Sequence, residues 1–174
     1  MRPLHENNRL LKLFVWAAVI AASVTLDQYT KRLAVEKLKP IGSYPLWEGV
    51  FHLTYVENTG AAFGILREHR WVFMLLSAVA VVGIIGYLVA RCKQTSMFEG
   101  IMLSLIAAGG IGNMIDRLKD GFVVDFFDFT LINFAVFNVA DSCVTVGAAL
   151  MIAYLVASEI KESKAKKRAA ASEK

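Results

Sequence analysis

The chain has 174 residues, of which 56% are hydrophobic and 20% charged, and its mean hydropathy is +0.51. Long uncharged runs separated by short polar segments exclude an ordinary water-soluble domain and predict an integral membrane protein. The net charge of +4 is unevenly distributed along the chain. We therefore interpret it as a signal of membrane topology and expect no nucleic-acid partner.

Four apolar helices are expected to cross the membrane. The run 71–90 has 20 residues without a charge, between Arg70 and Arg91, which matches the ~20 residues that span ~30 Å of hydrocarbon. The other three spans are expected at about residues 10–31, 97–115 and 137–158.

The remaining segments are short, and no internal repeat or linker divides them. We predict one membrane-embedded domain, 1–174, with outer segments at 32–70 and 116–136 and a cytoplasmic tail at 159–174. The expected fold class is all-α integral membrane: four transmembrane helices, a small extracytoplasmic β-hairpin element and a short outer loop.

The membrane orientation follows from the Lys and Arg content of each side. The side that holds the N-terminus, the loop 91–96 with the nearby Glu99, and the tail has 11 Lys and Arg against 5 acids, whereas the other side has 8 against 10. Because positive residues remain on the cytoplasmic side, both termini are expected there. The basic tail 161–174 is expected to be solvated, partly disordered and in contact with anionic lipid.

Two outer segments alternate in the manner of β-strands. From Gly49 onward, the segment 42–57 alternates apolar and polar side chains, which predicts a small hairpin on the membrane surface. A second alternation in 121–134 puts Phe122, Val124 and Phe126 on one face and Val123, Asp125 and Phe127 on the other. Asp125 is therefore expected in a strand or loop.

Polar and small residues on two spans recur at helical spacing and so form stripes. The stripes are Gly109, Gly112, Asn113 and Asp116 in the third span and Asn138, Asp141, Thr145 and Ala148 in the fourth. Small residues allow another helix or a substrate backbone to approach closely, and Asp141 is expected to face the bundle. In the first span, Asp27 and Lys31 stand four residues apart in the favourable acid-first order.

Asp125 and Asp141 are costly residues for this chain, because both lie where hydrophobic segments meet the membrane surface. An ionisable group in or near hydrocarbon costs several kcal/mol unless it is paired or used. Two close carboxylates that share one proton can hydrolyse an amide, one as base and the other as acid. The pKa of one member then rises, and the titration belongs to the pair.

The roles of the two acids differ in one respect. Asn138 is a candidate N-cap of the fourth helix, which would place Asp141 in the first turn, where the helix dipole favours its anion. We therefore expect Asp141 to be the more often ionised member and Asp125 the protonated one.

Five blocks between residues 27 and 141 together resemble the type II, or lipoprotein, signal peptidases. The blocks are Asp27-Gln28-Tyr29-Thr30-Lys31, Asn58-Thr59-Gly60-Ala61-Ala62-Phe63-Gly64, Gly109-Gly110-Ile111-Gly112-Asn113-Met114-Ile115-Asp116-Arg117, Gly121-Phe122-Val123-Val124-Asp125-Phe126 and Phe137-Asn138-Val139-Ala140-Asp141. One block alone is a weak signal, but five in family order are specific.

The resemblance implies an aspartic endopeptidase of the bacterial cytoplasmic (inner) membrane. Its family removes the signal peptide of diacylglyceryl-modified prolipoproteins, cutting before the lipidated lipobox cysteine, and the matched catalytic pair is Asp125 and Asp141. It implies these prolipoprotein signal peptides and membrane lipid as partners. We expect a multi-pass monomer with its active site toward the outer (periplasmic) face and with no cofactor or metal. Substrate-binding or pair-supporting roles are expected for Asn58, Gly60, Asn113, Arg117, Asn138, Asp27 and Lys31.

Each supporting residue also has a structural alternative. The three asparagines either serve the site or satisfy local backbone groups. The pairs Asp27 with Lys31 and Asp116 with Arg117 are expected to be structural ion pairs or helix-end charges. The segment 60–64 is either a moving loop or a tight turn, and Asp128 is expected to be an exposed interfacial charge.

Other functions are less consistent with the sequence. The histidines are scattered, which disfavours a metal site, and a Ser142 nucleophile with Lys31 as its base is a minor alternative. A small multi-spanning transporter or proton-relay protein that uses membrane carboxylates is the main alternative function. It would need acids near the bilayer midplane and two related halves, whereas the acids here lie toward the outer ends of the spans.

Overall fold

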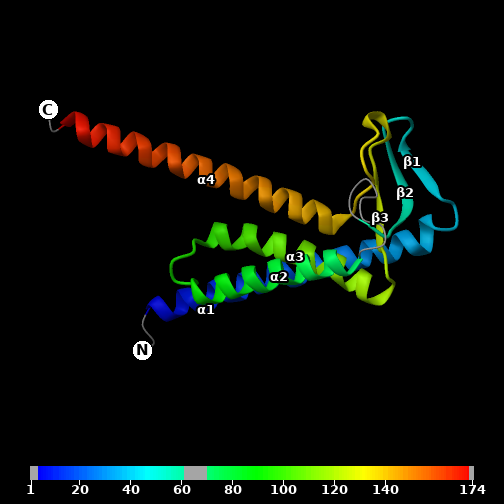
Figure 1. Cartoon of the computed structure of the whole chain (residues 1–174), viewed down its shortest axis with the longest axis horizontal. Helices are drawn as coiled ribbons and strands as arrows, with labels where there is room; N and C mark the ends of the chain where they lie inside the picture. The colour runs from blue at the N-terminus through cyan, green and yellow to red at the C-terminus, as the bar shows by residue number, and fades with distance from the viewer. Residues whose placement is uncertain (1–3, 61–69, 173–174) are drawn as a thin grey trace.

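The computed structural model describes residues 4–60 and 70–172, and this part of the chain is mainly helical (Figure 1). Helix α1 (Leu4–Leu33) continues into one π-helical turn, η1 (Ala34–Leu38). Strands β1 (Ser43–Trp47) and β2 (Phe51–Asn58) precede helices α2 (Arg70–Ala90) and α3 (Met97–Lys119). Strand β3 (Val123–Asp128) and the 3-10 turn η3 (Thr130–Ile132) lead to the last helix, α4 (Val139–Ser172).

Helix α3 is the centre of the bundle, because it packs against α1, α2 and α4. Its buried positions are mostly small residues, among them Ser104, Ala107, Ala108 and Gly112. A Cβ atom on Gly109 would overlap the carbonyl oxygen of Ala140 in α4. The glycines of the predicted stripe therefore permit close packing of helices.

In the part of the chain that the structure describes, three helices are long and apolar enough to cross a membrane: Asn8–Leu38, Met97–Lys119 and Val139–Lys166. Within the described residues, a shorter apolar helix spans Met74–Ala90, and it belongs to α2, which has 21 residues in all. The helical integral-membrane class predicted from the sequence is thus confirmed, with three to four apolar helices.

The strands form one antiparallel sheet in the order β1-β2-β3 at one end of the bundle (Figure 1). The predicted hairpin is present as β1 and β2, and β3 adds a third strand that the sequence analysis did not pair with it. Val124 and Phe126 of β3 pack in a buried cluster with Ala34 and Leu38 of η1. Val124 and Phe126 therefore share one face of β3 as predicted, although Phe127, predicted on the other face, also packs against this cluster.

The segment before α4 is tied to the same sheet. The backbone N–H groups of Phe126 and Phe127 donate to the carbonyl oxygen of Phe137 at 3.0 and 2.8 Å, and the Phe137 N–H donates to Phe127 at 3.1 Å. The start of α4 consequently lies beside β3, although the two segments are separated by a connection of irregular structure and η3.

The C-terminal tail differs from the prediction of partial disorder. Helix α4 does not end near residue 158 but continues to Ser172, and Figure 1 shows its last part extending away from the other helices. The tail contains strong helix formers, Ala, Lys and Glu, and a Lys166–Glu162 ion pair of 2.7 Å lies at helical spacing. Charge and exposure therefore did not prevent helix formation.

The close contact at Gly109 gives a stability prediction. Gly109→Ala should lower the melting temperature in detergent, because the added Cβ meets the rigid Ala140 carbonyl and overpacking costs about 1–3 kcal/mol. Gly83→Ala on α2 is the matched control: its Cβ would meet no atom within 4 Å, so helix propensity should raise stability by up to ~1 kcal/mol. Equal melting temperatures for the two variants would contradict the packing argument.

Candidate active site

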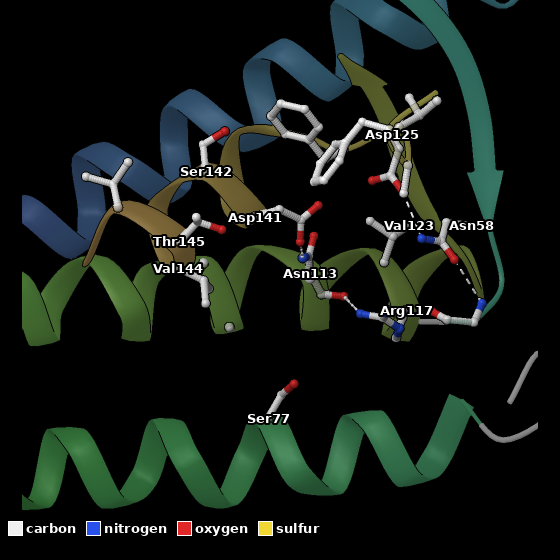
Figure 2. Close-up of a pocket in the computed structure, with 18 residues that line it drawn as sticks. Asn58, Ser77, Asn113, Arg117, Val123, Asp125, Asp141, Ser142, Val144 and Thr145 are labelled. Carbon is white, nitrogen blue, oxygen red and sulfur yellow. Dashed lines mark hydrogen bonds between the residues drawn. The ribbon is translucent and has the colours of Figure 1, made fainter. Parts of the chain in front are cut away.

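Asp125 and Asp141 line one cavity of about 580 Å³. Asp125 comes from β3 and is 1% exposed, and Asp141 comes from the first turn of α4. Figure 2 shows the two side chains on the same side of the cavity, with Asn113 below Asp141 and Ser77 of α2 across the open space. The structure thus brings the two predicted acids together from different local structures.

Amide side chains hold Asp125. Asn58 Nδ2 donates to Oδ2 at 2.8 Å, and Asn138 Nδ2 donates to Oδ1 at 2.6 Å. Both donors would favour the ionised carboxylate, but burial opposes them and is the largest influence. Together with the negative charge of Asp141, burial raises the pKa of Asp125 to about 7. Asp125 can therefore hold a proton near neutral pH.

Asp141 is held by a reciprocal helix cap. Its backbone N–H donates to Asn138 Oδ1 at 2.9 Å, and the backbone N–H of Asn138 donates to Asp141 Oδ2 at 3.2 Å. This pattern is a capping box with Asn at the N-cap and Asp at N3, as the sequence analysis expected of Asn138. Asn113 Nδ2 donates to the other oxygen, Asp141 Oδ1, at 2.7 Å.

Asn58 and Arg117 fix the backbone next to the cavity. Asn58 Oδ1 accepts the N–H of Gly60 at 3.0 Å, and Arg117 Nη2 donates to the Gly60 carbonyl oxygen at 3.1 Å. Arg117 Nη1 also donates to the carbonyl oxygen of Asn113 at 3.3 Å. The predicted residues Asn58, Gly60 and Arg117 all line the cavity, whereas residues 61–64 of the predicted loop lie outside the described residues.

Lys31 belongs to a buried ionic cluster beside the cavity. Its Nζ lies 2.9 Å from Asp27 Oδ2 and 2.7 Å from Asp116 Oδ2, and it donates to Asn113 Oδ1 at 2.8 Å. The expected ion pair of Asp27 and Lys31 is confirmed. For Asp116, the sequence analysis proposed Arg117 as partner, but the buried ion pair is formed with Lys31 because α1 packs on this face of α3.

Sequence reasoning missed two contacts of this cluster. Asp27 Oδ1 accepts the backbone N–H of Ala140 at 2.8 Å, so a residue of α1 caps the first turn of α4. Gln28 Nε2 donates to Asp116 Oδ1 at 2.7 Å. Gln28 lies in the segment 27–31 that resembles the family. It directly follows Asp27, however, so the four-residue spacing that relates Asp27 to Lys31 does not select it.

The alternatives raised by the sequence are less compatible with this geometry. Ser142 Oγ donates to the carbonyl oxygen of Asn138 at 2.9 Å, and Lys31 is engaged by Asp27, Asp116 and Asn113, so a serine–lysine site is disfavoured. Asp128 accepts from Thr54 Oγ1 at 2.8 Å and is half-buried, rather than fully exposed. In the described part of the chain, no three His, Cys, Asp or Glu side chains are grouped to hold a metal ion.

A helical membrane protein with two acids on one cavity, one of them able to keep a proton near neutral pH, has the features of the aspartic hydrolase class. Comparisons with known proteins agree. The family model described as signal peptidase (SPase) II matches residues 19–157. The chain belongs to this family and is accordingly an aspartic peptidase.

Individual relatives are similar over most of their length. A lipoprotein signal peptidase of Brevibacillus brevis is 45% identical over 139 residues, which cover 79% of this chain and 93% of the relative. That of Clostridioides difficile is 40% identical and covers 84% of this chain and 98% of the relative. A solved bacterial membrane enzyme has a TM-score of 0.73 at 30% identity, covering 82% of this chain and 87% of the other.

The raised pKa of Asp125 predicts a pH-dependent effect of Asp125→Asn on stability. A carboxyl whose pKa rises from 3.8 to about 7 on folding destabilises the fold increasingly as pH rises through that interval. Asn removes this cost. The stability of the variant relative to the parent should therefore increase by roughly 2–3 kcal/mol between about pH 5 and about pH 8. The measurement is thermal unfolding in detergent, and a difference independent of pH would contradict the raised pKa.

Proposed function

We propose that the protein removes the signal peptide from diacylglyceryl-modified prolipoproteins, cutting before the lipidated cysteine, with Asp125 and Asp141 as its catalytic pair. The observation that supports this most directly is the shared cavity, in which the two acids are held by Asn58, Asn113 and Asn138. Membership of the signal peptidase II family supports the substrate class, and the relatives are named lipoprotein signal peptidases.

In the proposed reaction, ionised Asp141 takes a proton from a water molecule as its oxygen attacks the scissile carbonyl carbon. Asp125, protonated at the start, donates to the carbonyl oxygen, so the tetrahedral intermediate forms without a free oxyanion. The C–N bond then breaks as the leaving nitrogen receives the proton held by Asp141, while Asp125 takes back a proton from a hydroxyl group of the intermediate and the C=O bond of the new carboxyl group forms. The two acids exchange roles of base and acid within one turnover, as one shared proton requires.

The cavity suits a substrate that comes from the bilayer. Beyond the two acids, its lining is largely apolar and includes Val136, Phe137, Val144 and Val146. An apolar wall can contact a signal helix or an acyl chain without leaving polar groups unsatisfied. A transporter or proton relay is the second function considered above, and the family match disfavours it.

The supporting residues have separate proposed roles. Asn58, Asn113 and Asn138 orient the acids through the hydrogen bonds described above. Arg117 and Gly60 form the edge of the cavity and are proposed to contact the substrate backbone. Asp27 and Lys31 support the pair from α1.

We also propose four membrane spans in a monomer, namely the three long apolar helices and α2. The distribution of Lys and Arg favours cytoplasmic termini. The sheet and the catalytic pair would then face the outer side of the bacterial inner membrane.

The catalytic pair is tested with Asp125→Asn and Asp141→Asn in a cleavage assay on a lipidated precursor peptide. Each variant should lose about 10²- to 10⁴-fold in kcat/KM, the range expected for removal of general acid–base catalysis. Asp128→Asn is the matched control, because Asp128 lies on the same strand but is bonded to Thr54. Full activity of either catalytic variant would refute the pair.

The topology is tested by thiol labelling of intact cells with a membrane-impermeant reagent. A cysteine at Glu48, in the turn between β1 and β2, should be labelled from outside, and one at Lys164, in the last part of α4, only after permeabilisation. Cys92 and Cys143 are replaced by alanine beforehand. The reverse labelling pattern would overturn the proposed orientation.

A further inference from the structure

The Lys31 ammonium group is buried next to the catalytic pair, and the proposed reaction gives it no direct part. Lys31 is 3% exposed. Its three N–H bonds are directed at three acceptors, Asp27 Oδ2, Asp116 Oδ2 and Asn113 Oδ1, at distances of 2.9, 2.7 and 2.8 Å. An ammonium has three donors and no acceptor, so its hydrogen-bonding capacity is fully used.

This ammonium determines which way the Asn113 amide points. Because Lys31 can only donate, the amide atom that faces it has to be the oxygen. The amide nitrogen then faces Asp141 Oδ1, to which it donates at 2.7 Å. With the amide rotated by a half-turn, the NH₂ group would face the ammonium and the oxygen would face the carboxylate, and both contacts would be repulsive.

The orientation of Asn138 is fixed in the same manner. The backbone N–H of Asp141 donates to Asn138 Oδ1 at 2.9 Å, so the Asn138 nitrogen faces Asp125 Oδ1 at 2.6 Å. The same nitrogen lies 3.2 Å from Asn113 Oδ1. Asn113 Oδ1 therefore accepts from Lys31 and from Asn138, and the two amides form a network that leads from the ammonium to both acids.

We propose that Lys31 is a positioning residue for the catalytic pair: it holds the Asn113 amide so that its N–H group faces Asp141. This inference rests on the proposed function of Asp125 and Asp141. The resulting hydrogen bond of 2.7 Å holds the Asp141 carboxyl group in one position on the cavity, where the proposed reaction needs its base.

Several charged groups lie near the pair. They are Asp27 and Lys31 from α1 and Asp116 and Arg117 from α3. Loss of the Lys31 charge alone would disturb all of them, so the experiment has to separate that general effect from the effect transmitted by Asn113.

The test is the pH profile of kcat/KM for Lys31→Met in the cleavage assay on a lipidated precursor peptide. The oxygen of the Asn113 amide then loses the stronger of its two donors and keeps only the longer contact of 3.2 Å from Asn138, so the amide is held less firmly. We expect kcat to fall about 10- to 100-fold, as for outer residues that orient a functional side chain, with KM changed less than about threefold. Because the pair holds its proton more tightly without the donor, the acid limb of the profile should move up by about one pH unit.

A double-mutant cycle with Asn113→Ala identifies the path of the effect. If Lys31 acts through Asn113, Lys31→Met should reduce kcat/KM less than about threefold further in the Asn113→Ala background. Independent, multiplicative losses would overturn the proposal, and so would an unchanged acid limb in Lys31→Met.

Lys12→Met is the matched control for general damage. Lys12 lies on the same helix, and its Nζ donates to the carbonyl oxygen of Thr95 at 2.8 Å, next to the loop between α2 and α3. This variant should lose stability without a shift of the acid limb. If Lys31→Met does not fold, Lys31→Met combined with Asp116→Asn removes one charge of each sign and is measured instead.

The outcomes separate this inference from the proposed function. Absence of cleavage by the parent protein, or full activity of Asp125→Asn, refutes the proposed function. If cleavage depends on both acids but the pH profile of kcat/KM in Lys31→Met is that of the parent, only the proposed role of Lys31 is refuted.

Discussion

The end of the bundle that carries the sheet depends on one buried ammonium group. Lys31 of α1 neutralises Asp116 of α3, and its helix neighbour Asp27 accepts the Ala140 N–H at the start of α4. Three helices are thus joined by charges that have little contact with solvent. Removing one partner of a buried ion pair costs about 3–5 kcal/mol, because the other charge is left unpaired. The helices are therefore held in one relative arrangement, in which Asn113 and Asn138 meet.

The two acids have different environments because they come from different local structures. Asp125 lies in a buried strand, and burial raises its pKa to about 7. Asp141 lies in the first turn of a long helix, where its carboxylate caps the N-terminus and interacts favourably with the helix dipole. An acid and a base are needed together for amide hydrolysis. The different environments of these two residues of the same type are the asymmetry on which the proposed reaction depends.

Features governed by local periodicity could be predicted from the sequence. The apolar run between Arg70 and Arg91 corresponds to α2, and the alternation around Asp125 correctly separated Val124 and Phe126 from the cavity face. Contacts between distant segments could not be predicted in this way. The pairing of β2 with β3 depends on register across 65 or more residues, and the partner of Asp116 depends on how α1 crosses α3.

For the candidate site, the two acids could be predicted from the sequence, but the hydrogen bonds that hold them could not. Helical spacing put Asp141 on the bundle face, and the resemblance to the type II signal peptidases linked it to Asp125. Neither observation shows which amide serves which acid, because an asparagine side chain can donate or accept on either side. That choice depends on Lys31 and on the backbone N–H of Asp141, which enter the site only after the helices have packed.

The charge of the site explains why its two acids should share a proton. Four carboxyl groups, those of Asp27, Asp116, Asp125 and Asp141, lie near the two cationic side chains of Lys31 and Arg117, so acidic groups outnumber basic ones in this part of the fold. Ionisation of Asp125 would add a negative charge next to Asp141, in a position that is 1% exposed. The three asparagines can donate to these acids but carry no charge that would compensate for it. Burial and the charge of Asp141 consequently favour a proton on Asp125 near neutral pH, and the proposed hydrolysis by a pair of carboxylates requires such a proton.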